Sequence, residues 1–231
     1  DSVGTSWGSA AAADASRHDR DHADDDFFVA KPSDSAKKIN NALARGQNLI
    51  FTPGIYHLDR TIEVKRAGTV VLGLGLPTLI PDQGQVAMQV ADVKNVVIAG
   101  VVFDAGPVNS PVLLQVGKRN AHESDKDRPT LLADVFFRIG GSAAGKATLS
   151  LEVNSDGVIL DNLWVWRADH GNGVGWTVNT ADTGVIVNGD DVTATGLFVE
   201  HYQKDEVVWN GQNGRVVFFQ NEMPYDPPSQ A

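Results

Sequence analysis

The stretch that decides the fold runs Val187-Asn188-Gly189-Asp190-Asp191-Val192 and is followed by Leu197-Phe198-Val199. It reads as the end of one strand, a polar turn and the next strand. The same pattern recurs in residues 90–96 with 101–103, 153–158 with 163–165, and 209–214 with 216–218, and residues 132–137 supply a further half-unit. The chain therefore contains an internal repeat.

The spacing of the repeat selects the architecture. Val192 and Gly214 hold the same place in their units and lie 22 residues apart, whereas Val158 and Val192 lie 34 apart because residues 168–183 are inserted. A short base period with insertions at one place in the unit is typical of stacked coils. We predict an all-β, single-stranded, right-handed parallel β-helix. The alternative is a β-sandwich, which favours two-residue hairpin turns and no constant turn chemistry.

The N-terminal part of the sequence differs from the repeat. Residues 1–26 are small, polar and charged, so we predict a disordered acidic linker there and a β-helix domain over residues 27–231, as part of a longer chain. A short amphipathic helix begins near Ala36, with Ser33 or Ser35 as its N-cap, and Gly46 ends it. We expect this helix to cap the core.

Composition excludes several classes of partner. The 231 residues are 42% apolar, which is enough for a buried core, and their net charge of -10 would repel a phosphate backbone. The absence of cysteine excludes disulfides and thiolate metal sites. No apolar run approaches the roughly 18 residues of a membrane span. We therefore expect neither nucleic acid nor a membrane as a partner.

The motif Asn188-Gly189-Asp190-Asp191 is similar to the paired aspartates of β-helical polygalacturonases, and His170-Gly171 is similar to their His-Gly element. The repeat favours another interpretation. Residues 154–157 and 210–214 occupy the same place in their own units and have the same Asn and Gly character. A turn with positive φ, or a stacked ladder of Asn side chains, explains this recurrence. We interpret the motif as structural.

Glu200 and Glu222 are separated by 22 residues, which matches the local period. We expect them on one face of adjacent coils, roughly 4.8 Å apart, with His201 and Tyr225 beside them. Two carboxylates this close do not both ionise easily, so the pKa of one should rise toward that of a general acid. Such an acid can protonate the leaving oxygen in glycoside cleavage. The alternative is that both are solvated carboxylates at the edge of the coils.

Aromatic residues gather in the same C-terminal third, which suits a sugar because its apolar face stacks on flat rings. They are Trp164, Trp166, Trp176, Trp209, Tyr202 and Tyr225. Trp164 and Trp166 share one face of their strand, and Leu163 and Val165 share the other. The sequence leaves open which pair faces the core. The inserted loop opens with Asp169-His170-Gly171, and such loops are natural places for specificity.

Two motifs resemble the C-terminal β-helix of glycoside hydrolase family 55, the exo-acting β-1,3-glucanases or laminarinases. They are Gly-Leu-Phe-Val-Glu-His-Tyr at residues 196–202 and Phe-Phe-Gln-Asn-Glu-Met-Pro-Tyr at residues 218–225. The wider stretch from residue 48 to residue 231, including Arg-Ala-Asp-His at residues 167–170, is similar to secreted actinobacterial proteins of this type. The resemblance implies a pectin-lyase-like fold, inverting hydrolysis of a β-1,3-glucan from a chain end, no cofactor, and an extracellular location.

The resemblance also implies residue roles. Glu222 would be the general acid and Glu200 a second catalytic carboxylate that orients and tunes it. The substrate-binding candidates are Asp169, His170, His201, Tyr225, Trp209 and Gln220. The base is unassigned, because inversion needs carboxylates roughly 6.5–9.5 Å apart, more than one coil spacing. The family pairs two β-helices side by side, so the expected partners are a polysaccharide and a second β-helix domain or chain.

Two other functions fit the same features. One is a non-catalytic glycan-binding or structural β-helix. The other is a polysaccharide lyase, for which Lys204 and Arg215 would be the basic residues near the glutamates, although the net acidity would repel a polyuronate. A calcium site built from Asp169, Asp182 or Asp190 lacks a recognisable ligand spacing, and we predict no metal.

Overall fold

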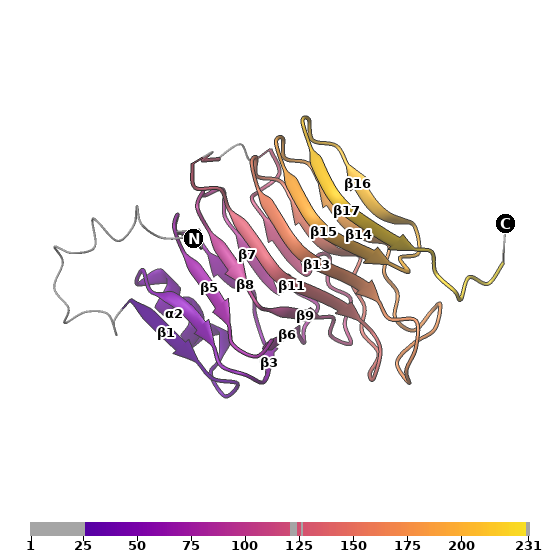
Figure 1. Ribbon diagram of the computed structural model, residues 1–231. Helices are drawn as coiled ribbons and strands as arrows, with labels where there is room; N and C mark the ends of the chain where they lie inside the picture. Colours follow the sequence, from indigo (N-terminus) through magenta and orange to yellow (C-terminus); the bar gives the residue numbers. More distant parts are fainter. Residues whose placement is uncertain (1–25, 121–123, 126, 230–231) are drawn as a thin grey trace, which may run out of the picture.

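A computed structural model describes residues 26–120, 124–125 and 127–229. Apart from Asp26, the predicted linker lies outside the described residues. Every strand pair in the described part of the chain is parallel, and the strands form two sheets that run along one axis in Figure 1. The chain is a parallel β-helix, as the repeat predicts, and the β-sandwich alternative is wrong. The right-handed sense of the coil stays a prediction.

The larger sheet contains eleven strands and forms the longest side of the coils. Its main order is β1-β2-β5-β8-β11-β13-β15-β17, and a side row β3-β6-β9 joins it at β11. The strands are β1 (Phe27–Ala30), β2 (Asn48–Phe51), β3 (Ile55–Leu58), β5 (Val70–Gly73), β6 (Thr78–Pro81), β8 (Val97–Ala99), β9 (Val102–Asp104), β11 (Leu131–Ile139), β13 (Ile159–Arg167), β15 (Thr193–Glu200) and β17 (Arg215–Glu222).

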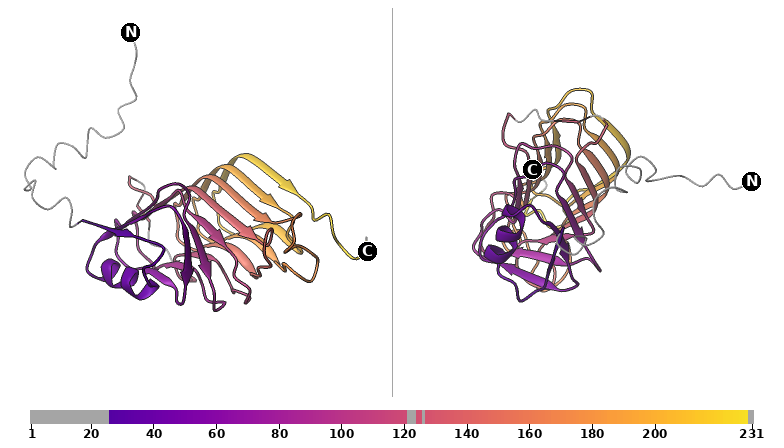
Figure 2. Two further views of the ribbon diagram at one scale, coloured as in Figure 1. Left: turned by 90° about the horizontal axis from the view of Figure 1, so that it is seen from below. Right: turned by 90° about the vertical axis from the view of Figure 1, so that its left-hand side faces the viewer.

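The second sheet has six strands in the order β16-β14-β12-β10-β7-β4. They are β4 (Ile62–Val64), β7 (Met88–Val90), β10 (Leu114–Val116), β12 (Leu149–Val153), β14 (Thr183–Val187) and β16 (Asp205–Trp209). The chain alternates between the sheets, so each coil passes from the larger sheet to the smaller one and back. Figure 2 shows the stacked coils from two further sides.

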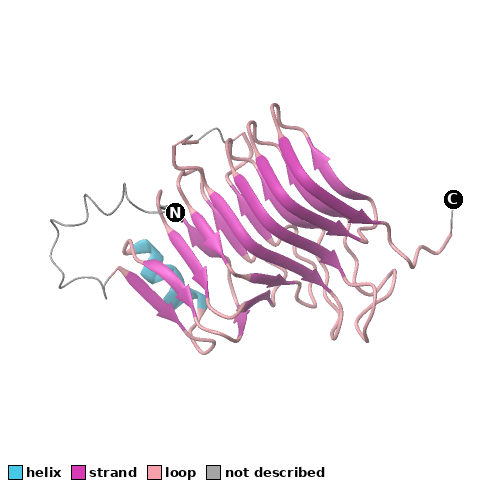
Figure 3. Ribbon diagram, in the orientation of Figure 1, coloured by secondary structure: helices cyan, strands magenta, loops and turns pink. Residues whose placement is uncertain are grey.

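The helix α2 (Ala36–Ala44) lies at the N-terminal end of the described coils, beside β1 and β2 (Figure 3). The Ser35 side chain accepts a hydrogen bond from the Lys38 backbone N–H, and Gly46 follows the helix with a φ of +92°. Ile39 and Leu43 are buried in the common core. The predicted capping helix is confirmed, with Ser35 as its N-cap. Nothing helical in the described residues has both the length and the apolar character needed to cross a membrane.

Strand register confirms both sequence periods. Thr193 pairs with Arg215, 22 residues on, and Ile159 pairs with Thr193, 34 residues on. The extra residues of the longer coil lie between β13 and β14, where they are predicted. The expectation that insertions occur at one place only is wrong, because β8 also pairs with β11 at an offset of 34. There the extra residues lie between β10 and β11, at the other corner of the coil.

Strand alternation fills the interior. In β13, Leu163 and Val165 are buried, whereas Trp164 is 41% exposed and Trp166 is half-buried. In β15, Leu197 and Val199 occupy the same inward positions and are also buried. The apolar pair is therefore core, and the two tryptophans lie on the outer face of the larger sheet.

One residue per coil bends the larger sheet. Gly100, Asp134, Asn162, Gly196 and Phe218 occupy successive equivalent positions, and all have φ between 51° and 69°. Left-handed backbone is natural for Gly, and Asn and Asp tolerate it. The bend divides the early coils into separate strands, such as β8 and β9, whereas β11 continues through it.

The recurrent Asn positions form a ladder at the corner that precedes β13, β15 and β17. Asn210 donates to the Asn188 side-chain oxygen at 2.8 Å, and Asn188 donates to that of Asn154 at 2.7 Å. Asp191 and Asn213 beside the ladder have positive φ. The structural interpretation of the motif at residues 188–191 is confirmed, because its amide and backbone are occupied in the turn.

Candidate active site

The two glutamates stand side by side where the strands of the larger sheet end. Glu200 is the last residue of β15 and Glu222 the last of β17, and they are register partners. Trp166, one coil earlier, is the register partner of Glu200. All three side chains point to the outer face, because the alternate residues Val165 and Val199 point into the core. The predicted stacking of the carboxylates is confirmed.

Different groups hold the two carboxylates. The Trp164 indole N–H donates to Glu200 Oε2 at 2.9 Å, so Glu200 is bound to the preceding coil. Glu222 accepts a hydrogen bond from Gln220 Nε2 at 3.1 Å and another from the Tyr225 hydroxyl. The Glu222 side chain is 40% exposed and remains accessible to a ligand.

His201 lies behind Glu222 and is fixed by its backbone and its ring. Its φ is +68°, and its N–H donates to the Glu222 carbonyl at 2.7 Å. Nδ1 lies 3.0 Å from the Met223 carbonyl oxygen, which can only accept, so Nδ1 carries the proton. Nε2 therefore faces Glu222 Oε2, at 3.8 Å. The ring is buried and packs against the Tyr225 ring with centroids 4.6 Å apart.

The inserted loop adds two of the predicted residues. Asp169 Oδ1 lies 2.9 Å from His170 Nδ1, and the His170 ring lies 5.3 Å from the Trp166 ring. Burial raises the pKa of Asp169, but the hydrogen bond from His170 and the charge of nearby His201 outweigh it, so the pKa is lower than usual. The loop thus brings an ionised carboxylate close to Trp166, through His170.

The two tryptophans form an aromatic stack next to Glu200. The rings of Trp164 and Trp166 are stacked, with centroids 5.0 Å apart and planes 19° apart. Phe198 follows Trp164 on the next coil in register. Six of the candidate site residues therefore lie together: Glu200, Glu222, His201, Tyr225, Gln220 and Asp169. His170 joins them through Trp166.

Three residues named from the sequence lie elsewhere. Trp209 ends β16 and is half-buried against the core, at the corner opposite the one beside the glutamates, so it does not belong to this cluster. Arg215 begins β17, whereas Glu222 ends it. Lys204 pairs with Asp182 at 2.6 Å. The predicted proximity of Arg215 to the glutamates is wrong, because one strand length separates them.

Sequence reasoning missed Glu206. Ser150, Gly184 and Glu206 hold equivalent positions at offsets of 34 and 22, but they fall between the paired residues of the smaller sheet, where strict alternation fails. The Glu206 carboxylate accepts from the Tyr202 backbone N–H at 3.2 Å. Burial, reinforced by the Glu200 charge and opposed by that hydrogen bond, raises the pKa of Glu206 to about 7. A protonatable acid therefore lies behind the turn that carries His201.

Arg167 is the second missed residue, although alternation gives a signal for it. It follows Leu163 and Val165 on the inward side of β13, and a charge at such a position needs partners. Its side chain is 1% exposed and pairs with Asp226 at 2.9 Å. This hydrogen-bonded ion pair lowers the pKa of Asp226.

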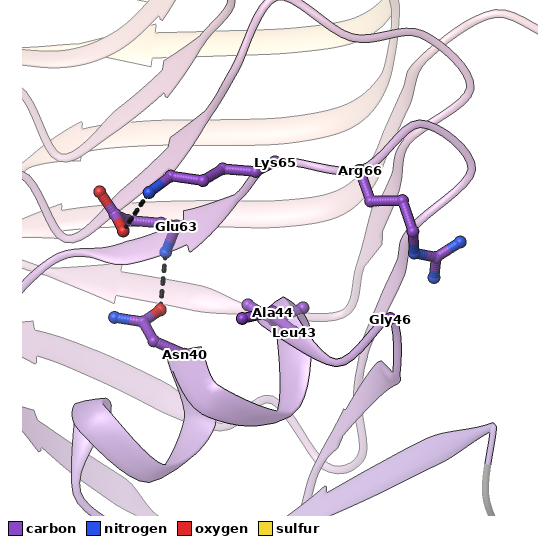
Figure 4. A pocket seen from close by; sticks show the side chains of 7 residues that line it. All are labelled: Asn40, Leu43, Ala44, Gly46, Glu63, Lys65 and Arg66. Carbon is purple, nitrogen blue, oxygen red and sulfur yellow. Dashed lines mark hydrogen bonds and ion pairs between the residues drawn. The ribbon is translucent and has the colours of Figure 1, made fainter.

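The hollow between α2 and β4 in Figure 4 is lined by Asn40, Leu43, Ala44, Gly46, Glu63, Lys65 and Arg66. There Asn40 accepts from the Glu63 backbone N–H at 2.9 Å, which holds the helix on the coil, and Lys65 pairs with Glu63 of its own coil at 2.7 Å. In the described part of the chain, no three His, Asp or Glu side chains are grouped as metal ligands.

Known proteins resemble this chain in sequence and in fold. The model of a LAM55 pectate lyase-like domain matches residues 27–222. An exo-beta-1,3-glucanase of Streptomyces sp. (strain SirexAA-E / ActE) is 56% identical over 207 residues, which are 90% of this chain and 34% of that protein. The chain thus spans about a third of the length of this curated relative.

Two solved structures have the same fold as this chain. SacteLam55A from Streptomyces sp. SirexAA-E superposes with a TM-score of 0.87 at 56% identity, over 89% of this chain and 37% of that chain. A variant of sacteLam55A in complex with glucose gives the same TM-score at 55% identity and the same coverage.

Proposed function

The chain belongs to the family of LAM55 pectate lyase-like domains, and on this premise we propose that it carries the acid side of the active site of an exo-β-1,3-glucanase. Its similarity to the Streptomyces exo-beta-1,3-glucanase supports the reaction and the substrate class. The stacked pair of Glu200 and Glu222 is the observation that carries the proposal. The substrate is a neutral glucan, which suits the acidic net charge.

Glu222 is the general acid. It begins the reaction protonated and gives its proton to the glycosidic oxygen while the bond from that oxygen to the anomeric carbon breaks. Tyr225 and Gln220 already donate toward the Glu222 oxygens, so they stabilise the carboxylate that remains after proton transfer. The exposed face of Glu222 is the side from which the sugar approaches.

Glu200 orients and tunes the acid rather than activating water. Adjacent coils place the two residues roughly 4.8 Å apart, whereas an inverting pair needs roughly 6.5–9.5 Å to admit a water molecule. Glu200 is also held by the indole of Trp164. We assign the water-activating base to a second β-helix domain or chain, which accords with the share of the Streptomyces relative that this chain spans.

The stacked tryptophans supply the platform for the sugar. The stack of Trp164 and Trp166 offers an uncovered apolar ring face to a glucose ring, and Asp169 and His170 beside it offer hydrogen-bonding groups to the hydroxyls. Gln220, His201 and Tyr225 surround Glu222. A polysaccharide substrate implies an extracellular place of action.

Substitution of the acid tests the assignment. In the full natural protein, we expect Glu222→Gln to lower kcat on laminarin by about 10²–10⁴. The same variant should retain most of its activity on 2,4-dinitrophenyl β-glucoside, whose leaving group needs no proton. Glu200→Gln should also slow laminarin more than the dinitrophenyl glucoside, because Glu200 acts through the acid. Glu63→Gln, on the remote β4, should slow neither substrate. Full laminarin activity in Glu222→Gln would refute the assignment.

One alternative function is also supported by a structural feature. The exposed tryptophan surface also suits a domain that binds glycan without cleaving it. Calorimetric binding of laminari-oligosaccharides by the natural protein, without sugar release, would establish that reading instead.

A further inference from the structure

The Arg167 guanidinium joins three segments that the sequence keeps apart. Its Nε donates to the Asn179 carbonyl at 2.9 Å and its Nη2 to the Gly175 carbonyl at 3.3 Å, which fixes the inserted loop. Its Nη1 donates to the His201 carbonyl at 3.2 Å, in the turn after β15. The ring of Trp176 lies 5.5 Å from the guanidinium carbon.

The third segment is the tail after β17. Asp226 receives two parallel hydrogen bonds from Arg167, each 2.9 Å long. A bidentate pair of this kind fixes direction as well as distance. Tyr225 immediately precedes Asp226, and its side chain is 69% exposed. Its ring rests on His201, and its hydroxyl donates to Glu222. The tail has little other packing to hold this ring in place, because Met223 is 73% exposed as well.

We propose that the Arg167–Asp226 ion pair is a positioning device that holds the Tyr225 hydroxyl on Glu222. Neither Arg167 nor Asp226 is among the hydrogen-bond partners of Glu222 in the described residues, so the ion pair acts through Tyr225. Because Arg167 also holds the inserted loop, the loop and the acid take their positions from one guanidinium. The role of this device in catalysis rests on the proposed function of Glu222, but the placement of Tyr225 does not.

The charges around Tyr225 allow the placement to be measured. The hydrogen bond to Glu222, followed by burial and the negative charges of Glu222, Asp169 and Glu200, raises the pKa of Tyr225. The chain has only three tyrosines, and Tyr56 and Tyr202 are buried. Tyr225 is therefore the one expected to titrate nearest to the ordinary range of a phenol.

The first experiment is a thermodynamic cycle read by ¹³Cζ-tyrosine NMR. The Tyr225 pKa is measured in the natural protein, in Asp226→Asn, in Glu222→Gln and in the double variant, and Tyr225→Phe assigns the resonance. We expect Asp226→Asn to lower the Tyr225 pKa when Glu222 is present and to change it much less when Glu222 is replaced. An equal change in both backgrounds would mean that Asp226 acts only as a distant charge, and would overturn the proposal.

Two further variants keep this experiment decisive. Asp226→Glu retains the charge but moves the carboxylate by one methylene, so it should also lower the Tyr225 pKa if position matters. Asp182→Asn breaks the ion pair with Lys204 at the far end of the loop and should leave the Tyr225 pKa unchanged. If Asp226→Glu has no effect, or Asp182→Asn has the same effect as Asp226→Asn, the positioning role is wrong.

The second experiment measures kcat/KM on laminarin. Loss of a hydrogen bond to a charged group corresponds to about a tenfold decrease, so we expect Tyr225→Phe and Asp226→Asn each to lose about that factor. The double variant should be no slower than Tyr225→Phe alone, because both changes remove one effect. Multiplicative losses would overturn the proposal. If the natural protein is inactive on laminarin, the proposed function fails, and the NMR cycle still decides the positioning role.

Discussion

Replacing Asn188 by Ala tests whether the Asn ladder stabilises the stack of coils. Asn188 is the middle member, so the substitution removes its bond to Asn154 and its bond from Asn210. Each bond contributes about 1 kcal/mol net. Asn154 is only 3% exposed, so its oxygen loses its donor in a buried site, which costs about 1–2 kcal/mol more. The expected loss of unfolding free energy is about 3–4 kcal/mol.

Asn210→Ala is the matched control. Asn210 is exposed and lies at the end of the ladder, so its replacement removes one bond and leaves water access to Asn188. We expect a loss of about 0.5–1 kcal/mol. Urea unfolding followed by circular dichroism gives both values, provided that the slope with urea is the same in each variant. If Asn188→Ala costs no more than Asn210→Ala, the ladder is an effect of the fold and not a source of its stability.

Three further predictions concern the core and the site. Protonated Glu206 stabilises the fold fully below its unfolded pKa of 4.5, and this contribution is lost as pH rises through about 7. Glu206→Gln should therefore be more stable than the natural protein at pH 8, by about 1–2 kcal/mol after discounting for partial exposure, and urea titrations at pH 4.5 and 8 would detect it. Trp164→Phe keeps the ring but removes the donor to Glu200, so kcat/KM on laminarin should fall by about three- to tenfold, with no change in circular dichroism. Leu163→Ala should cost about 2–4 kcal/mol in urea unfolding because it empties a buried position; a cost below that of an exposed substitution would contradict the inward orientation.

The sequence sufficed for the features that repeat from coil to coil. The separations of 22 and 34 residues are the register offsets of β15 with β17 and of β13 with β15, so they predict that Glu200 and Glu222 are neighbours. The turn chemistry at residues 188–191 repeats in the same way. A repeat determines such positions because each coil meets the same backbone geometry as the last.

Features that depend on a break in alternation or on a corner were not predictable. Glu206 occupies the position of Ser150 and Gly184 in the smaller sheet, where burial does not alternate, so a period of two does not predict its partial burial. Closeness in sequence groups Trp209 with Glu222, although the coil places Trp209 at the opposite corner. The bend at Phe218 is hidden as well, because an aromatic residue gives no sign of positive φ.

The buried guanidinium of Arg167 sets a limit on how this molecule can be rebuilt. Surface loops of a β-helix can usually be exchanged between related proteins, because the stacked coils tolerate loops of different lengths at their corners. Here β13, the loop at residues 168–182 and the tail at residues 223–226 are joined by the N–H groups of Arg167. They must therefore be exchanged together. A chimaera that takes the loop but keeps a foreign tail would bury a cation without its counter-ion. Recombination across this region should therefore succeed only when all three segments come from the same parent.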